Sequence, residues 1–395
     1  MSPLRCLAWL VALSSACFHP AFDRPRCGAA RECPGGQVCA SDGTCVPPVP
    51  PGTPDASAAP DAGEVPVDGP ACYGTGIVRI CLATLPSAPL AIAATTRIDT
   101  GDAGMCAQTI SGADGYCVIA ATSIAINTNV RVVGPKPLVF LASDMITSMA
   151  GTIVDAGSHH FAPGTPPDNG AGADPLGCAP GTPPSNGGGG AGGSFGGVGG
   201  NGGVGDNAGN GGVAGAATTA AELRGGCPGQ DGEGAPADRG SRGHGGGAVF
   251  FLAASKIELA GNVLAAGGGG NQALRNAAGA GGGGSGGMIG FDAPTITVTG
   301  TLIANGGAGA EGASGNNAGR PGDDATSLTA AAGGRGGNLN GGDGGDGSAG
   351  AAAGSGGPGS KGFLGGGGGG GGGAGIVMAP AAAALGTKVS PAATR

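Results

Sequence analysis

The sequence predicts an all-β protein, a right-handed parallel β-helix (solenoid) with glycine-rich, polyproline-II-like inserts, preceded by a small disulfide module. Two observations predict this fold class. A unit of three short runs of alternating apolar residues recurs along residues 71–395, and such coils bury their inner faces only by stacking on one another. Glycine accounts for 95 of the 395 residues, which leaves too few side chains for a usual packed core.

The repeat is clearest in residues 250–267 and 289–306, which align without a gap so that Gly261 matches Gly300. Residues 123–134 repeat the second half of this unit, 139–157 repeat the whole with one extra residue, and a weaker copy lies at 376–389. Each copy is expected to hold short alternating strands, in the first one Phe250/Leu252, Ile257/Leu259 and Val263/Ala265. An antiparallel sandwich is the alternative, but two-residue hairpin turns between long strands are missing.

The glycine tracts, at about 164–247 and 306–375, are not random in sequence. Glycine recurs every third residue in runs such as Gly196, Gly199, Gly202 and Gly205. A polyproline II helix has three residues per turn, so this spacing places glycine on one face, where neighbouring chains can approach closely. We therefore expect ordered layers of glycine helices packed beside the solenoid. Flexible glycine-rich loops are the competing interpretation.

The N-terminus predicts export. Residues 1–16 have the basic, apolar and small-residue regions of a signal peptide. The Ser14-Ser15-Ala16-Cys17 junction resembles the lipobox of bacterial lipoproteins, which implies that Cys17 is lipidated and becomes the mature N-terminus. Removing Cys6 with the signal peptide and acylating Cys17 leaves ten of the twelve cysteines, an even number for an oxidising compartment. Simple secretion is the alternative.

Behind an anchor segment at 17–26, the ten remaining cysteines suggest disulfides. Residues 27–45 are expected to form a two-disulfide module, since so short a segment cannot bury a core. The cysteines of this module are Cys27, Cys33, Cys39 and Cys45. Proximity predicts the further pairs Cys72 with Cys81 and Cys106 with Cys117, and elimination predicts Cys178 with Cys227. A zinc site is disfavoured because paired CxxC knuckles are missing. Residues 46–70, rich in Pro, Ala and Asp, predict an extended stalk.

The order of these parts resembles a known group of sequences. The segments CYGTGIVRICL, GGGGAGGSFGGVGGNGG and GHGGGAVFFLAA follow the cysteine module and stalk. Together they are similar to uncharacterised glycine-rich predicted surface lipoproteins of myxobacteria. The module itself resembles the small cysteine-rich modules that follow the anchor in many such lipoproteins. The resemblance implies a lipid-anchored surface protein, and it carries no assigned activity.

Several short motifs resemble functional patterns that so glycine-rich a sequence also produces by chance. Ser194 and Ser285 each stand in a G-x-S-x-G pattern, but neither is followed by the helix that a nucleophile elbow requires. Asp343 and Asp346 are weak calcium candidates, because the nonapeptide phase of calcium-binding repeats is missing. Asp155, His159 and His160 form one polar cluster, with Asp168 and Asp174 nearby in sequence. This cluster is expected to be an exposed loop, and a polysaccharide-cleaving site is the alternative.

Composition limits the function. The net charge of -8 without a Lys/Arg cluster argues against nucleic acid as a partner. We expect a non-enzymatic structural or adhesive lipoprotein at the outer membrane or cell surface, with its membrane contact through the lipid and an extracellular glycan or envelope component as its partner. No cofactor is expected apart from weak calcium binding. A glycan- or ice-binding module and a β-helix polysaccharide lyase or hydrolase are the alternatives.

Overall fold

The computed structural model describes residues 27, 32–33, 37–39, 45–46, 71–106, 110–111, 115–160, 168–206, 209–350, 354 and 364–395. The chain divides into two compact units, Met1–Pro66 and Val67–Arg395. The predicted signal peptide, Cys17, the anchor segment and nearly all of the stalk lie outside the described residues. Strands are the only regular elements in the part of the chain that is described.

The first unit contains a small antiparallel pair, β1 (Val38–Cys39) with β2 (Cys45–Val46). Two disulfides, Cys27–Cys39 and Cys33–Cys45, cross-link it. The first cysteine thus bonds the third and the second bonds the fourth, a connectivity that the even spacing left open. The sulfurs of Cys27, Cys33 and Cys45 lie within 4.8 Å of one another, but each belongs to a disulfide, so they are not thiolates ready to bind zinc.

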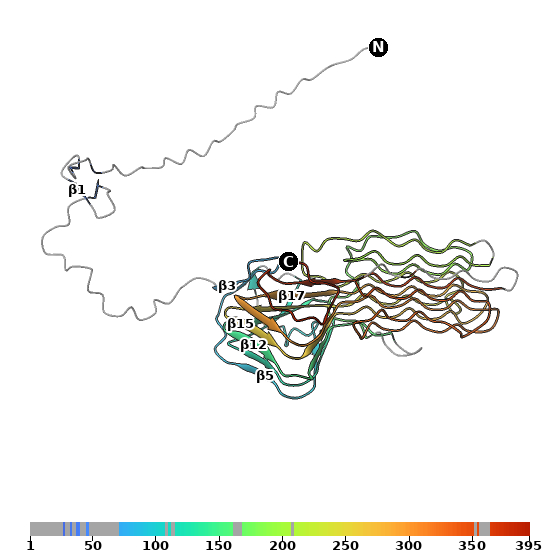
Figure 1. The fold of residues 1–395 in the computed structure, drawn as a ribbon, viewed down its shortest axis with the longest axis horizontal. Coiled ribbons are helices and arrows are strands. Elements are labelled where there is room, and N and C mark those ends of the chain that lie inside the picture. The colour runs from blue at the N-terminus through green and yellow to red at the C-terminus, as the bar shows by residue number, and fades with distance from the viewer. Residues whose placement is uncertain are drawn as a thin grey trace, which may run out of the picture. The chain divides into compact units, whose positions relative to one another are not determined.

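The second unit is built on three parallel sheets, which the chain visits in rotation (Figure 1). The first sheet contains β8 (Cys117–Ala121), β11 (Leu138–Ala142), β14 (Ala248–Ala253), β17 (Met288–Asp292) and β20 (Ile376–Met378). The second contains β5 (Leu90–Ile92), β9 (Ile124–Ile126), β12 (Met145–Ser148), β15 (Lys256–Leu259) and β18 (Thr295–Val298). The third contains β6 (Thr96–Asp99), β10 (Val130–Val133), β13 (Ile153–Asp155), β16 (Asn262–Leu264), β19 (Leu302–Ile303) and β21 (Val389–Ser390). Each strand therefore pairs with its counterpart one circuit later.

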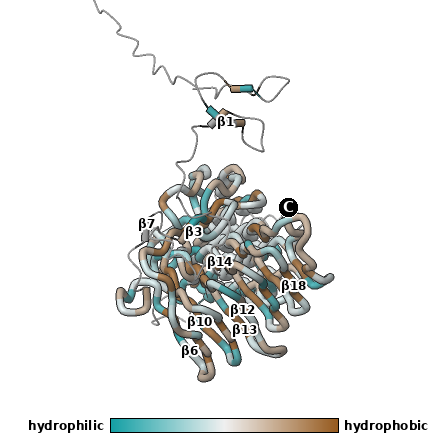
Figure 2. Tube along the Cα trace, turned by 90° about the vertical axis from the view of Figure 1, so that its left-hand side faces the viewer, coloured by the Kyte–Doolittle hydropathy of each residue, from teal (hydrophilic) through white to brown (hydrophobic). Residues whose placement is uncertain are grey.

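The core between the three sheets consists of the inward residues of every strand. Figure 2 shows hydrophobic residues recurring at similar places in successive stacked strands. Three phenylalanines from neighbouring strands stack in a row: the ring centroids of Phe140 and Phe251 lie 5.6 Å apart, and those of Phe251 and Phe291 lie 5.5 Å apart. All three side chains are buried, so this row is a large apolar contribution to the stability of the stack.

The pairing register corrects the sequence alignment in the first strand of the repeat. Ile257 pairs with Ile296, as the gapless alignment predicts, but Phe251 pairs with Phe291, one residue further on. The inward residues of β14 are therefore Val249 and Phe251, whereas Phe250 and Leu252 belong to a second cluster on the outer face. Because a one-residue slip would turn every inward side chain outward, the core enforces this register. The bend after β17 is therefore one residue shorter than the bend after β14.

A small antiparallel sheet covers the outer face of the first parallel sheet. It contains β3 (Ala71–Tyr73), β4 (Ile80–Leu82) and β7 (Ile110–Ser111). Its Ile80 and Leu82 are buried in one cluster with Val139 and Phe250. Residues 71–82 are therefore not a parallel coil, although the sequence analysis counted them with the solenoid. The Cys72–Cys81 disulfide joins directly opposite residues of β3 and β4, which favours a local hairpin.

The glycine-rich segments run beside the sheets and are joined by backbone hydrogen bonds. In segment 279–287 the N–H groups donate to three neighbouring segments in rotation: Gly279, Gly282 and Ser285 to 227–233, Ala280, Gly283 and Gly286 to 367–373, and Gly281, Gly284 and Gly287 to 265–271. Its carbonyl groups accept from three more segments, 190–193, 240–246 and 307–310. Six segments thus surround it, and the three-residue period is that of a polyproline II helix. We call this arrangement the glycine lattice.

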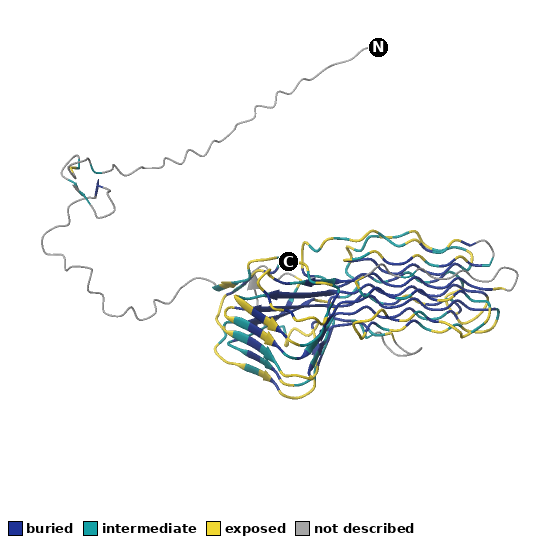
Figure 3. Cartoon of the chain, in the orientation of Figure 1, coloured by how far each residue is buried: buried dark blue, intermediate teal, exposed yellow. Residues whose placement is uncertain are grey.

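Crowding in the glycine lattice explains where glycine is required. Segment 365–375 is also surrounded, and its residues 365–373 are all glycine. A Cβ at Gly369, Gly370 or Gly371 would lie about 2 Å from a carbonyl oxygen, and that oxygen belongs to a different neighbouring segment in each case. On the outer segment 198–206, by contrast, every third residue is larger and exposed, namely Val198, Asn201 and Val204. Glycine thus fills two positions of three on this outer segment and every position of 365–373 in the interior, where Figure 3 shows continuous burial.

Backbone hydrogen bonds join the described glycine residues within the tracts for which the glycine period predicts ordered layers. The central segment 279–287 lies between the two predicted tracts and outside both gapless repeat copies, 250–267 and 289–306, so the predicted tract bounds missed it. Three disulfides join the predicted cysteines of this unit: Cys72–Cys81, Cys106–Cys117 and Cys178–Cys227. The last one closes a separation of 49 residues that includes lattice segments 186–197, 199–206 and 209–215.

Candidate functional site

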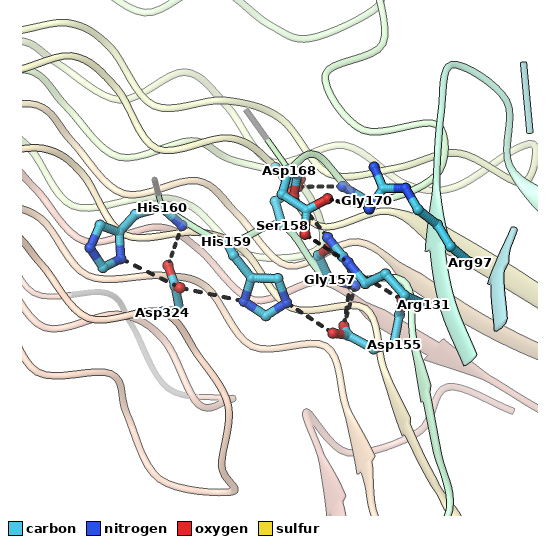
Figure 4. A network of polar contacts seen from close by, with 11 residues as sticks. Arg97, Arg131, Asp155, Gly157, Ser158, His159, His160, Asp168, Gly170 and Asp324 are labelled. Atoms are coloured by element: carbon cyan, nitrogen blue, oxygen red, sulfur yellow. Dashed lines mark hydrogen bonds and ion pairs between the residues drawn. The ribbon is translucent and has the colours of Figure 1, made fainter. Parts of the chain in front are cut away.

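The predicted polar cluster lies on the outer face of the third sheet. Arg131 on β10 is the register partner of Arg97 on β6 and of Asp155 on β13. Since partners in adjacent strands are about 4.8 Å apart, their outward side chains meet. The chain leaves β13 through Gly157 and Ser158 and reaches His159 and His160, so the sheet edge and the start of the glycine lattice share one polar network (Figure 4).

Arg131 is the centre of one half of the network. Its Nε lies 3.0 Å from Asp168 Oδ2, and its Nη1 lies 3.3 Å from Asp155 Oδ1. Nη1 and Nη2 also donate to the backbone carbonyls of Asp155, Gly157 and Asp168. Arg97 Nη1 binds the other oxygen of Asp168 at 3.1 Å. One guanidinium therefore fixes both the end of β13 and the returning segment at 168, because its planar donors reach several oxygens at once.

His159 is the centre of the other half. Its Nε2 lies 2.9 Å from Asp155 Oδ2, and its Nδ1 lies 3.4 Å from Asp324 Oδ2. Asp324 also faces His160 Nδ1 at 3.5 Å, and it accepts from the backbone N–H groups of His160 and Gly269. Asp324 belongs to a lattice segment far along the chain, so this carboxylate connects residues 159–160 to the glycine lattice.

These contacts set the charge states. Hydrogen bonds to Asp155 and Asp324 raise the pKa of His159 to about 9, although burial acts in the opposite direction. Burial alone would raise the pKa of Asp324, but its hydrogen bonds from His159 and His160 bring that pKa well below its usual range. Burial also opposes ionisation of Asp168, and Arg131 and Arg97 together lower its pKa. At neutral pH the network therefore contains an imidazolium and carboxylates that already have cationic partners.

The cluster differs from the exposed loop that its sequence predicts, because the side chains of Asp155 and His159 are only 19% and 31% exposed and are held within this network. Arg97, Arg131 and Asp324 were not among the sequence candidates. The two arginines are recognisable only once the strand register is known, and Asp324 is 165 residues from His159. Asp174 lies apart from the network, with its Oδ2 2.5 Å from His244 Nδ1.

The network makes stability depend on pH. Because the folded pKa of His159 is raised above its ordinary value of 6.5, its contribution is complete below pH 6.5 and is lost as pH rises through about 9. We expect the free energy of unfolding to fall by roughly 2 kcal/mol over that interval. Denaturant unfolding of wild type and His159→Gln at pH 6 and 9.5 checks this. The variant should be less stable at pH 6 and flatter in its pH dependence; equal slopes for the two proteins would contradict the assignment.

The two motif serines are buried. Ser285 is fully buried, and its Oγ both accepts from Cys227 N and donates to Cys227 O. Ser194 is 5% exposed and its Oγ accepts from Gly199 N. Each hydroxyl satisfies backbone groups of a neighbouring turn or segment. They serve the glycine lattice, and the G-x-S-x-G matches reflect its glycine content.

The calcium candidates lie on one lattice segment, where a three-residue period puts Asp343 and Asp346 on the same side. Asp346 forms an ion pair with Arg335 and accepts a hydrogen bond from Gly333 N. Within the described ranges, no third acidic residue or histidine joins them in a compact ligand group.

A shallow groove of about 300 Å³ crosses the outer face of the second sheet. Thr147, Glu258 and Thr297 line it, and they are register partners on β12, β15 and β18. Ser148 and Thr299 extend the hydroxyl lining, and Lys256 Nζ lies 3.2 Å from Glu258 Oε2. The groove therefore presents hydrogen-bonding groups at a repeat of about 4.8 Å.

The chain was compared with known proteins at three levels. No protein-family model, no curated protein and no solved structure matches it. Within the described ranges, no helix has the length and apolar character needed to cross a membrane.

Proposed function

We propose that this chain is a non-enzymatic structural or adhesive protein of the cell surface, exported by residues 1–16 and anchored by lipid on Cys17. In this proposal the three parallel sheets form a right-handed parallel β-helix, and the lattice segments are polyproline II helices packed beside it. The observation that carries the proposal is the glycine lattice. Its hydrogen bonds run in three-residue rotation between segments far apart in sequence, which suits a stiff body for display more than a reacting site.

Glycan binding is a second candidate, and the groove on the second sheet favours it. Hydroxyl and carboxylate groups at Thr147, Glu258 and Thr297 follow one line across the strands. A spacing of about 4.8 Å per strand is close to the length of one sugar unit in an extended polysaccharide. Ice binding has less support, because Ala125 and Glu258 occupy this line where a continuous threonine array would be required.

Adhesion of cells that display the full chain tests the proposal. Wild type and Cys17→Ser are expressed in the same host, and we measure membrane association together with attachment to surfaces coated with envelope polysaccharides. We expect Cys17→Ser to move the chain from the membrane to the medium and to abolish the added attachment. Thr147→Ala/Thr297→Ala should reduce attachment to polysaccharide severalfold without changing membrane association.

Two results would contradict the proposal. Unchanged attachment when the chain is displayed or removed would exclude an adhesive role. Shortening of an acidic polysaccharide by wild type but not by His159→Ala/His160→Ala would establish the lyase alternative instead.

A further inference from the structure

The Cys178–Cys227 disulfide has an unusual polar neighbour. Arg224 Nη2 lies 3.4 Å from the Sγ atoms of both cysteines. The guanidinium is held in place, since its Nη1 donates to Gly177 O at 3.3 Å and its carbon lies 5.3 Å from the ring centroid of Phe195. A fixed cation beside sulfur stabilises a thiolate relative to a thiol. Reduction of this disulfide should therefore be easier than reduction of a disulfide that closes a loop of similar length without a cationic neighbour.

The two sulfurs differ in access. Cys227 is 3% exposed, whereas Cys178 is half-buried. Both cysteines line a cavity of about 210 Å³, so a small thiol approaches Cys178 more readily than Cys227. Attack on Cys178 would make Cys227 the leaving group, and Cys227 lies beside Arg224. Because Arg224 Nη2 is equally close to both sulfurs, access alone sets this direction of exchange, and Arg224 stabilises the thiolate that leaves.

From this geometry we propose that Cys178–Cys227 is a thiol–disulfide exchange site for dithiol reductants, with Arg224 as the residue that positions and stabilises the leaving thiolate. A thiolate of the dithiol attacks Cys178 Sγ, the Cys178–Cys227 bond breaks, and its electron pair goes to Cys227 Sγ. The second thiolate of the dithiol then attacks the mixed disulfide at the reductant's own sulfur and releases Cys178 as a thiolate. The dithiol ends as a disulfide; its two protons go to solvent or to the released sulfurs.

The exchange would act on the glycine lattice. The disulfide ties segment 225–233 to the start of a stretch that supplies three lattice segments, within 186–215. Reducing it removes the covalent tie, leaves those segments held by hydrogen bonds and packing, and loosens one side of the lattice. This role is independent of the proposed adhesive function.

Cys106–Cys117 is a matched internal reference. Cys117 is completely buried, and Cys106 Sγ faces the carbonyl oxygen of Thr100 at 3.5 Å, an electron-rich neighbour that does not stabilise a thiolate. Burial lowers the pKa of Arg224, and the negative charge of Glu222 acts in the opposite direction.

The test uses the full oxidised chain in buffers of reduced and oxidised dithiothreitol, with acid quenching, alkylation and peptide mass mapping. We expect Cys178–Cys227 to be reduced at a lower reductant ratio than Cys106–Cys117. Arg224→Gln should raise the required ratio about tenfold, which is about 30 mV for a two-electron couple, and Arg224→Lys should restore part of it. Neither variant should change Cys106–Cys117.

Thiolate stability is measured separately in Cys178→Ser, where the rate of Cys227 alkylation against pH should give a pKa below the ordinary 8.5. Adding Arg224→Gln should raise that pKa. The proposal is overturned if Arg224→Gln leaves both the reductant ratio required for Cys178–Cys227 and the acid dissociation constant of the Cys227 thiol within twofold of their values with Arg224 present. Hydrogen exchange in 186–215 of the oxidised variants shows whether they are folded. If Arg224→Gln is not folded, the comparison of Arg224→Lys with wild type decides. If Arg224→Gln is folded, an Arg224→Lys variant that is reduced no more easily than Arg224→Gln also overturns the proposal.

Discussion

Gly283→Ala is expected to destabilise the Val67–Arg395 unit by about 3 kcal/mol or more, because no space exists for the new methyl group. A Cβ on Gly283 would lie 2.2 Å from Gly307 O and 2.6 Å from its carbon. Gly283 also donates to Gly370 O and accepts from Gly193 N, so it cannot shift without disturbing three segments. The free energy of unfolding in denaturant measures the loss.

The matched control is Gly76→Ala, where the added methyl group would meet nothing within 4 Å. Its stability should change by less than about 1 kcal/mol, in the stabilising direction. Val204→Ala, at an exposed position of the glycine lattice, should also be nearly neutral. If Gly283→Ala behaved like these two variants, the lattice would not be as tightly packed as its hydrogen bonds indicate.

Phe251→Ala is expected to lower the free energy of unfolding by about 4 kcal/mol, since it removes the middle ring of the buried row and leaves a cavity between Phe140 and Phe291. Phe251 is completely buried and stacks on both Phe140 and Phe291. Thermal unfolding and denaturant midpoints give the measurement. Leu85→Ala, at a 57% exposed side chain, is the control and should change stability by less than about 0.5 kcal/mol. A loss below about 1 kcal/mol for Phe251→Ala would show that the row is not part of a packed core.

Much of the strand pattern was predictable because burial follows local alternation. The strands around Ile257 and Ile296 were expected from the repeat, and the structure pairs them in the predicted register. The first strand was misread, since Phe250 and Phe251 are both apolar and only one faces inward. Both faces of the first sheet are buried, so alternation disappears there and the sequence alone cannot choose the register.

The polar network was predictable only in part. Asp155 and His159 are four residues apart, so their contact is local. Arg131 and Asp324 reach the same place from other circuits of the chain, and a single sequence contains no signal for such distant pairing. The same reason applies to Arg224, whose position over the Cys178–Cys227 sulfurs depends on the fold of the 49-residue loop.

What the sequence determined by itself is the local chemistry: alternating strands, the cysteines available for pairing, and glycine at every third residue of the tracts. These features depend on residues that are near one another in the chain, so their spacing can be read directly. Only the tertiary structure decided which segments become neighbours. It placed 279–287 at the centre of six others, joined Asp324 to His159, and set the register of β14. These contacts depend on the packing of segments brought together across long loops, where hydrogen bonding and steric exclusion act between residues that no local pattern connects.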